Sequence, residues 1–371
     1  MPQRRRVLLL IPHLGGGGAE RVTSLLAQNL AREKYELHLG LVAQSKPLTE
    51  AFPPWVSIHS LGASRVRFAA IPLVRLIRRL RPDAILSGMM HLNSLLLLLR
   101  PFLPRKTAVL VRQNSTLSAA LAFGNRPGGK RLLYRFCYRK ADRVICQSAS
   151  MATDLIAELH LPSRLLSVLP NPVDVDKLRE ASADKTSQWS GPGPHLLAVG
   201  RLSPEKGYDL LLSALAMVRL RFPQTDLIIT GSGPEERTLK VQSRKLCIES
   251  AVRFAGYVDH PHKYFSGASA FVLSSRHEGM PNALLEAAAG GLPIIALPSS
   301  GGVNDLLQGQ PGVWLAPEIS ANALAATLLS ALEVLRLHQR FEHAFVEPFR
   351  IDRAILAYES LIDSDFSERP Q

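Results

Sequence analysis

Glu278 and Glu286 are two carboxylates separated by seven residues, beside a predicted strand-to-helix turn. The apolar run 270–273 predicts a buried strand, and Pro281 is expected at the first position of the following helix. At about 1.5 Å per residue, Glu286 lies roughly 8 Å along that helix from Pro281. The carboxylates are then too far apart to share a proton but could hold two parts of an extended polar ligand, with the free helix-start amides between them as an anion site. The alternative is a surface Glu followed by a solvated Glu within the helix.

Arg201 and Lys206 are two cations in the loop 200–207, which joins a predicted strand to a predicted helix. Arg presents a planar fork of donors and Lys a movable point charge, a combination that suits a diphosphate. Two ordinary surface cations are the alternative. Because a helix start slightly disfavours positive charge, their position there favours a functional role.

Two glycine-rich loops also follow predicted strands, the first of them at 15–18. In the second, Gly231 and Gly233 would let the backbone approach a flat ligand. Neither loop matches the G-x-G-x-x-G fingerprint of dinucleotide-binding folds, because Glu20 and Glu236 occupy the third glycine position. Nicotinamide-dinucleotide binding is therefore not expected, and we predict no cofactor.

The chain is basic in its first half only. Its formal net charge is +13, but residues 1–180 hold 27 Lys and Arg against 11 Asp and Glu, whereas residues 181–371 hold 17 against 20. This asymmetry indicates an anionic partner that only one domain meets. The three cysteines lack metal-binding or disulfide-framework spacing, which is typical of a reducing compartment, and no apolar run approaches the ~18–20 residues of a membrane span.

Strands and helices alternate along the chain, which predicts an α/β fold with parallel sheets covered on both faces. In the first half, strands are expected at 7–11, 35–42, 56–59, 83–87, 108–111, 144–146 and 166–169, and helices at 19–32, 72–80, the Leu-rich stretch after 90, 130–141 and 150–160. In the second half, strands are expected at 195–199, 227–230, 252–255, 270–273 and 294–297, and helices at 207–222, 234–246, 281–289, 320–338 and 350–362. The small and polar stretch 181–194 predicts a linker between domains at 1–180 and 195–345, followed by a C-terminal helix within 346–371.

Six segments in this order resemble the group 1 retaining glycosyltransferases, often called family 4, which have the GT-B fold. They are Gly17-Gly18-Ala19-Glu20-Arg21, Asn171-Pro172-Val173-Asp174, residues 200–207, Gly231-Ser232-Gly233-Pro234, residues 254–258 and the pair Glu278 and Glu286. The resemblance spans nearly the whole chain and is strongest in the second half. It implies two Rossmann-like α/β domains facing across a cleft, with a C-terminal helix that crosses back to the first domain through side chains such as Tyr358.

The resemblance also implies a role for each candidate residue. Arg201 and Lys206 would hold the nucleotide diphosphate and stabilise it as leaving group in place of a metal ion. Glu278, the third member of this catalytic group, would bind hydroxyls of the donor sugar, and Glu286 would accept hydrogen bonds from the ribose. Further substrate contacts are expected from Gly17, Gly18, Gly231, Gly233, Gly279, Met280, Pro281 and Asn282. The implied reaction is a front-face transfer with retention, in which a donor phosphate oxygen takes the acceptor's proton.

One position departs from the family pattern. Many members have a histidine just after the strand that corresponds to 108–111, where this chain reads Arg112-Gln113-Asn114. Arg112 or Asn114 would then contact the sugar or the acceptor. His13 and His91 are candidate substitutes for the missing histidine.

Two basic amphipathic helices are expected in the first domain, where the family binds its acceptor. In the helix at 72–80, Leu73, Leu76, Ile77 and Leu80 share a face beside three arginines, and in the helix at 130–141, Leu132, Leu133 and Phe136 lie beside Arg131, Arg135 and Arg139. Such helices are typical of proteins on anionic membranes, although ordinary surface helices with wet arginines are the alternative. We therefore hypothesise a peripheral enzyme on the cytoplasmic face of a bacterial membrane, with a lipid-linked or polysaccharide-precursor acceptor such as those of lipopolysaccharide synthesis.

Competing hypotheses remain at this stage. The donor would be a UDP-sugar carrying a hexose or N-acetylhexosamine, with GDP-mannose or a soluble small acceptor as alternatives on the same fold. A nucleotide-sugar epimerase would not need a basic first domain. A nucleic-acid-binding protein could share the charge of +13, but the chain has no aromatic-studded basic motif, so no nucleic-acid partner is expected.

Overall fold

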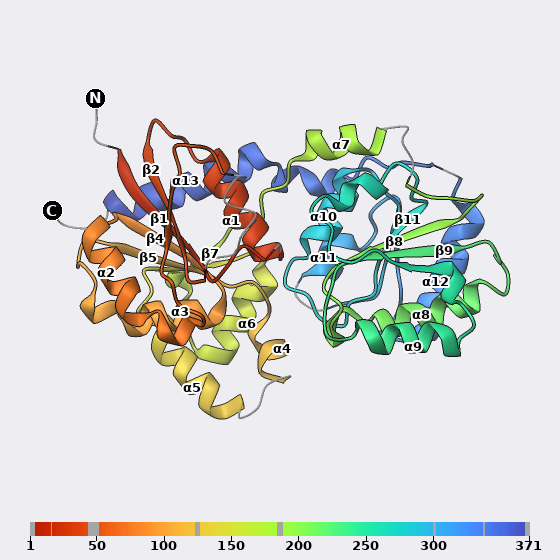
Figure 1. The fold of residues 1–371 in the computed structure, drawn as a ribbon, viewed down its shortest axis with the longest axis horizontal. Helices are drawn as coiled ribbons and strands as arrows, with labels where there is room; N and C mark the ends of the chain where they lie inside the picture. The colour runs from red at the N-terminus through yellow and green to blue at the C-terminus, as the bar shows by residue number, and fades with distance from the viewer. Residues whose placement is uncertain are drawn as a thin grey trace. The chain divides into compact units, whose positions relative to one another are not determined.

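The computed structural model describes residues 4–15, 17–43, 52–122, 127–183, 188–299, 302–336 and 338–367. The chain forms two compact units, one made of Met1–Pro172 with Asp352–Gln371 and the other of Val173–Ile351. Each unit is a parallel sheet with helices on its faces, as the alternating pattern predicted (Figure 1).

The first unit contains a seven-stranded sheet in the order β3-β2-β1-β4-β5-β6-β7. Its strands are β1 (Arg5–Ile11), β2 (Tyr35–Leu41), β3 (Ser57–Ser60), β4 (Ala84–Gly88), β5 (Ala108–Arg112), β6 (Arg143–Cys146) and β7 (Leu166–Val168), and every pairing is parallel. Its helices are α1 (Gly18–Asn29), α2 (Ala70–Leu80), α3 (Met90–Leu98), α4 (Leu117–Ala122), α5 (Pro127–Tyr138), α6 (Ala149–Leu159) and α13 (Ile351–Ser367). One apolar core joins Leu8 and Leu10 of β1 to α2, α3 and α6. Helices α1 and α13 lie on the other side of the sheet (Figure 1).

The second unit contains a six-stranded sheet in the order β10-β9-β8-β11-β12-β13. Its strands are β8 (His195–Val199), β9 (Asp226–Thr230), β10 (Val252–Phe254), β11 (Ala270–Leu273), β12 (Ile294–Ala296) and β13 (Val313–Leu315). Its helices are α7 (Val175–Ala183), α8 (Tyr208–Val218), α9 (Glu236–Lys245), α10 (Asn282–Ala289), α11 (Val303–Leu307) and α12 (Ala321–Val334). Alternate residues of β11 enter different cores: Phe271 packs with α7, α10 and α11, whereas Val272 packs with α8 and α12. This explains why the buried strands read as continuous apolar runs.

Several boundaries differ from the sequence prediction. The stretch expected as a linker at 181–194 begins inside α7, because Val175 and Leu178 of that helix are buried in the second unit. Residues 184–187 of the stretch lie outside the described residues. The units divide earlier, at Pro172 and Val173, where Val173 N–H donates to Phe349 O at 2.8 Å. The sequence analysis did not predict α4, α7, α11 or β13, and the last helix runs to Ser367 rather than 362.

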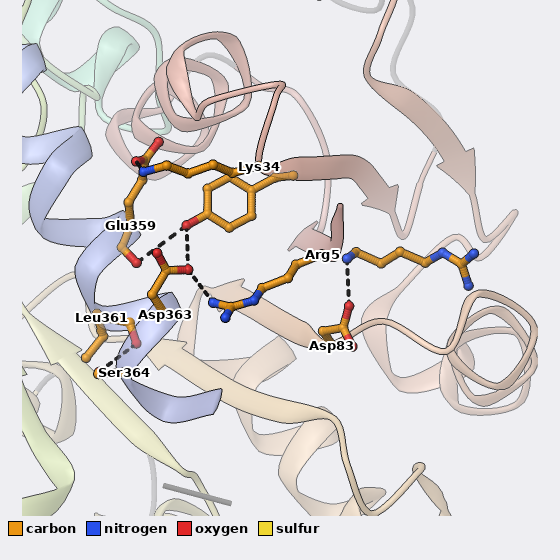
Figure 2. A network of polar contacts seen from close by, with 9 residues as sticks. Arg5, Lys34, Asp83, Glu359, Leu361, Asp363 and Ser364 are labelled. Carbon is orange, nitrogen blue, oxygen red and sulfur yellow. Dashed lines mark hydrogen bonds and ion pairs between the residues drawn. The ribbon is translucent and has the colours of Figure 1, made fainter. Parts of the chain in front are cut away.

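Helix α13 belongs to the first unit although about 180 residues separate it from β7. Glu359 and Asp363 of α13 face Lys34 and Arg5 (Figure 2). Glu359 accepts hydrogen bonds from Lys34 Nζ and from Ala31 N–H, both at 2.9 Å, and Tyr35 donates to Asp363 at 2.9 Å. The C-terminal helix is therefore fixed to the N-terminal strand region by partly buried charges, as the resemblance implied.

Tyr358 provides a second attachment of α13. Its hydroxyl accepts a hydrogen bond from Arg112 Nε at 3.1 Å, and its ring is almost fully buried. The predicted docking role of Tyr358 is thus confirmed. Within the described ranges, no helix is both long and apolar enough to cross a membrane.

Replacing Glu359 by Ala should lower the free energy of unfolding by about 1–3 kcal/mol, because the partly buried Ala31 amide and the Lys34 ammonium both lose their acceptor. The measurement is urea unfolding of the full chain. Ser360→Ala on the exposed side of the same helix is the control and should change stability by no more than about 0.5 kcal/mol. Equal losses in the two variants would show that the Glu359 contacts do not hold α13.

Candidate active site

Two loops leave neighbouring strands at the point where the strand order of the second unit reverses. Strand β8 pairs with β9 on one side and with β11 on the other, and the chain continues outward in opposite directions from there. The loop 200–207 follows β8, and the turn 274–281 follows β11. In parallel α/β sheets this switch point is the preferred ligand position. The fold therefore brings the two predicted site segments to one place.

Lys206 and Glu278 form an ion pair at this switch point. Lys206 Nζ donates to Glu278 Oε1 at 2.6 Å, and Ser275 Oγ donates to the same oxygen at 2.6 Å. The Glu278 side chain is only 9% exposed, so both donors act on a carboxylate that is largely removed from water. The sequence analysis assigned Lys206 to the diphosphate and Glu278 to the sugar of the same ligand. The structure shows that they also orient each other.

Arg276 fastens the loop after β8 to the turn after β11. Its guanidinium donates to both carboxylate oxygens of Asp209, at 2.8 and 2.6 Å, and to Pro204 O at 2.8 Å. Its backbone N–H donates to Glu205 O at 2.8 Å. Hydrogen bonding by Arg276 lowers the pKa of the Asp209 carboxyl below its usual value, which keeps the pair charged over a wide pH range.

Gly207 allows the closest approach of the two segments. A Cβ at this position would lie 2.1 Å from Ser274 O, and the backbone is in the left-handed region with φ of 64°. Ser274 Oγ in turn donates to Lys206 O at 2.8 Å. Any side chain at 207 would push the turn away from Lys206, so this glycine is needed for the geometry of the ion pair.

Gly231 and Gly233 serve a related purpose in the loop after β9. A Cβ on Gly231 would lie 1.9 Å from Gly200 O, and one on Gly233 would lie 2.2 Å from Leu202 O. The sequence analysis expected these glycines to admit a flat ligand. Their absent side chains instead admit the backbone of the neighbouring loop, and contact with a ligand stays a prediction.

The remaining site residues of the second unit lie around this pair. Arg201 is exposed, so its guanidinium is accessible to an anion, while Leu202 beside it is buried and anchors the loop. Glu286 is 7% exposed on α10.

The start of α10 differs by one residue from the prediction. Pro281 is the N-cap residue, with ψ of 111°, and not the first helical residue as expected. Because this ψ is extended and not helical, the helix begins one residue later, at Asn282. Gly279 and Met280 are buried, and Asn282 is half-buried.

Arg112 and Asn114 lie in the first unit, where Arg112 has protein partners that the sequence analysis did not predict. The Arg112 guanidinium is buried and donates to Tyr358, to Asn114 Oδ1 at 2.9 Å and to the Asn171 side chain. These hydrogen bonds give Arg112 a structural role that ties β5 to α13. A contact with sugar or acceptor stays a prediction for both residues.

Gly17 and Gly18 stand at the start of α1. A Cβ on Gly17 would lie 2.5 Å from Glu20 Oε2, so the glycine makes room for a carboxylate of its own helix. The expected approach of Gly17 and Gly18 to a diphosphate or acceptor stays a prediction.

Sequence reasoning missed Ser275, Arg276 and Asp209. Arg276 and Asp209 are separated by 67 positions, and neither carries a motif that marks the pairing. Ser275 precedes Glu278 by three residues, a spacing at which a hydroxyl can reach a turn carboxylate, but that signal is common in proteins.

Gly207→Ala should lower the free energy of unfolding by about 3 kcal/mol, since it combines left-handed strain with a clash against the Ser274 carbonyl. Gly256→Ala is the matched control, because φ there is 68° but no atom lies within 4 Å of the added Cβ. The control should lose only about 1 kcal/mol. Urea unfolding of both variants checks this, and equal losses would mean that the contact with Ser274 is not tight.

Two family models match the chain, one on each half. The model described as "Glycosyl transferases group 1" matches residues 181–344, and the model described as "Glycosyltransferase Family 4" matches residues 16–177. The first contains Arg201, Lys206, Glu278 and Glu286, and the second contains Gly17, Gly18 and Arg112.

The chain is also similar to individual proteins. A glycogen synthase of Mycobacterium tuberculosis is 36% identical over 198 residues, 53% of this chain and 46% of that protein, so the chain matches only about half the length of this relative. A lipopolysaccharide core biosynthesis glycosyltransferase, LpsE of Rhizobium meliloti, is 26% identical over 230 residues, 61% of this chain and 66% of that protein.

Among solved structures, Anabaena Alr3699/HepE in complex with UDP and glucose superposes with a TM-score of 0.78 at 20% identity, over 97% of this chain and 100% of that chain. At this identity the superposition shows a common fold. The superposition covers nearly the whole chain, so the protein has the GT-B fold. Because the two family models match successive halves of the chain, the protein belongs to the group 1, family 4 glycosyltransferases.

Proposed function

We propose that the protein transfers a hexose or N-acetylhexosamine from a nucleotide-diphosphate sugar, with UDP favoured, to a lipid-linked or polysaccharide-precursor acceptor. The observation that carries the proposal is the Lys206–Glu278 ion pair, with the exposed Arg201 on the same loop, at the switch point of the second sheet. Arg201 and Lys206, which would bind the diphosphate, lie on the loop after β8, and Glu278, which would bind the sugar, lies on the turn after β11. Hydrogen bonds join these two segments.

Lys206 can serve both partners at once. An ammonium has three N–H donors, and Glu278 takes one of them. The others are left for diphosphate oxygens, and Arg201 adds a planar fork of donors. Since Lys206 remains beside Glu278 when it binds the diphosphate, the carboxylate is held next to the sugar end of the donor.

The reaction that fits this arrangement is a front-face transfer with retention. The bond between the anomeric carbon and the phosphate oxygen breaks, and its electron pair leaves with the diphosphate. The acceptor oxygen forms its new bond on the same face, and its proton passes to the departing phosphate oxygen. Arg201 and Lys206 stabilise the charge that develops on the diphosphate, as fixed cations can do without a metal ion.

The relatives agree with this class of substrate without fixing the acceptor. HepE, which has the same fold, was solved with UDP and glucose, and LpsE is named for lipopolysaccharide core synthesis. UDP-glucose is therefore the first donor to examine, and GDP-mannose is the second.

UDP binding tests the assignment of the cations. Lys206→Ala and Arg201→Ala should each weaken UDP binding about 10- to 100-fold, because each removes a charge-assisted contact to the diphosphate. Arg237→Ala, an exposed cation on α9, is the control and should leave the affinity unchanged. Calorimetric titration of the full chain measures these affinities. Unchanged UDP affinity in both loop variants would contradict the proposed site.

Membrane association is the second component of the proposal, and α5 supports it better than α2. Leu73, Leu76 and Ile77 of α2 are buried in the core of the first unit, so this apolar face does not reach the surface. On α5, by contrast, Leu132 and Phe136 are 69% and 56% exposed. The expectation of a membrane-facing apolar surface therefore fails for α2 and stays a proposal for α5.

The surroundings of the α5 apolar residues are cationic. Lys130, Arg131, Arg135, Arg139 and Lys140 lie on or directly after the same helix, and Lys140 Nζ lies 4.0 Å from the ring centroid of Phe136. Arg131 is partly neutralised by Glu158 at 2.7 Å. Apolar side chains surrounded by such charges are the pattern of a surface that binds anionic lipid headgroups. We propose that this surface places the enzyme on the cytoplasmic face of the membrane.

Co-sedimentation with vesicles tests the α5 surface. The full chain should bind vesicles that contain phosphatidylglycerol several-fold better than neutral phosphatidylcholine vesicles, and Leu132→Ser with Phe136→Ser should remove most of that binding. Leu220→Ser, an 89% exposed leucine in the second unit, is the control. Equal binding to both vesicle types would count against the membrane component while leaving the donor site unaffected.

A further inference from the structure

The Glu278 carboxylate is bound by the protein through one of its two oxygens. Lys206 Nζ and Ser275 Oγ both donate to Oε1, each at 2.6 Å, and no donor among the described residues reaches Oε2. Part of the side chain, 9%, stays exposed, so protein atoms do not close off Oε2. The carboxylate therefore presents one oxygen, with its full capacity to accept hydrogen bonds, to a ligand.

Ser275 is a fixed donor, because the residues on both sides of it are bound to the loop after β8. Ser274 Oγ donates to Lys206 O at 2.8 Å. Arg276 N–H donates to Glu205 O, also at 2.8 Å. Ser275 itself is 1% exposed and directly follows this first anchor at the end of β11. A hydroxyl on so short a buried side chain has few positions open to it.

Lys206 alone would not hold the carboxylate in one plane. The terminal torsion of a glutamate side chain is broad, and an ammonium with three donors on a flexible stem can be shared between both carboxylate oxygens. In that arrangement Oε2 would face the lysine and not a ligand. The hydroxyl of Ser275 adds a second donor on Oε1, and two donors on a single oxygen define the plane of the carboxylate and hence the direction of Oε2.

We propose that Ser275 is a positioning residue for the donor sugar, because its hydroxyl holds the Glu278 carboxylate so that Oε2 accepts hydrogen bonds from sugar hydroxyls. The inference rests on the proposed transferase function, in which Glu278 binds the sugar. Ser275 acts through Glu278 and contacts neither the diphosphate nor the sugar. Loss of its hydroxyl leaves both cations of the loop 200–207 in place, so it changes the binding of the sugar and not that of the nucleotide.

Calorimetric titration of the full chain with UDP-glucose and with UDP separates these two effects. The quantity measured is the ratio of the Kd for UDP-glucose to the Kd for UDP. In Ser275→Ala this ratio should rise about tenfold, because a charge-assisted hydrogen bond that orients the carboxylate is lost. The Kd for UDP alone should change by less than about twofold.

Two further variants separate the hydrogen bond from packing. Ser275→Cys has nearly the volume of serine but only a weak S–H donor, so its ratio should rise as in Ser275→Ala. Ser243→Ala is the matched control in the same unit, because it also removes a buried hydroxyl, which donates to Lys240 O at 2.9 Å on α9. Its ratio should equal that of the parent chain. If Ser275→Ala does not fold, the rise is required of Ser275→Cys.

The outcomes that would overturn the proposal are distinct. An unchanged ratio in Ser275→Ala means that the hydroxyl does not position the sugar contact. Equal weakening of UDP and UDP-glucose would assign Ser275 a purely structural role, and a normal ratio in Ser275→Cys would assign the effect to packing. GDP-mannose and GDP supply the same ratio if the parent binds GDP and not UDP. A parent that binds neither nucleotide overturns the proposed function together with this inference, whereas normal nucleotide binding with an unaffected ratio overturns the role of Ser275 alone.

Discussion

The site of the second unit depends on the close backbone contact between the loop after β8 and the turn after β11. Gly207 lies so near the Ser274 carbonyl that a Cβ would reach within 2.1 Å of it. The Arg276–Asp209 pair fastens the same two segments through side chains. Because both segments are fixed, Lys206 and Glu278 meet at hydrogen-bond distance, with little side-chain entropy left to lose when a ligand binds.

The first unit depends on a different constraint, the return of the chain at α13. Arg112, buried at the end of β5, donates to Tyr358 of that helix, and Glu359 and Asp363 bond the region around β1 and β2. The residues that complete this unit thus come from the far end of the sequence. An arginine in a position that suggested substrate contact serves this closure, since a buried guanidinium is stable only when its donors are satisfied.

The sequence predicted the parts of the fold that are written in continuous apolar runs. Strands such as β1 and β8 and the corner from β11 to α10 were located within one or two residues, because a strand covered on both faces must be apolar throughout. Short elements such as β13 were missed, because three half-buried residues carry no distinct period. Helix α7 was missed because it runs into the polar stretch that begins at residue 181 and buries only Val175 and Leu178.

Within the candidate sites, the sequence identified residue types but not their partners. The same amphipathic pattern occurs in α2 and α5, yet the apolar face of α2 packs in the core and that of α5 carries exposed leucines. Periodicity tells which residues share a face and not what that face contacts. The Arg276–Asp209 pair was invisible for the same reason, since pairing across 67 residues is decided by the order of strands in the sheet.

In each sheet the strand order reverses once, at β1 and β4 in the first unit and at β8 and β11 in the second. The carboxylates near these two points differ in how many hydrogen bonds they accept. Glu278 is held by Lys206 and Ser275, so its orientation exists before any ligand arrives. Glu20 occupies the corresponding region of a sheet wound in the same order, but its buried Oε1 has no hydrogen-bond donor within the described residues. A carboxylate whose oxygens already accept hydrogen bonds keeps its orientation without a ligand, whereas an oxygen that lacks a donor gains a hydrogen bond only when a donor is brought to it. The carboxylate of the second unit is thus held in one orientation by its neighbours, whereas one buried oxygen of the carboxylate in the first unit keeps its capacity to accept.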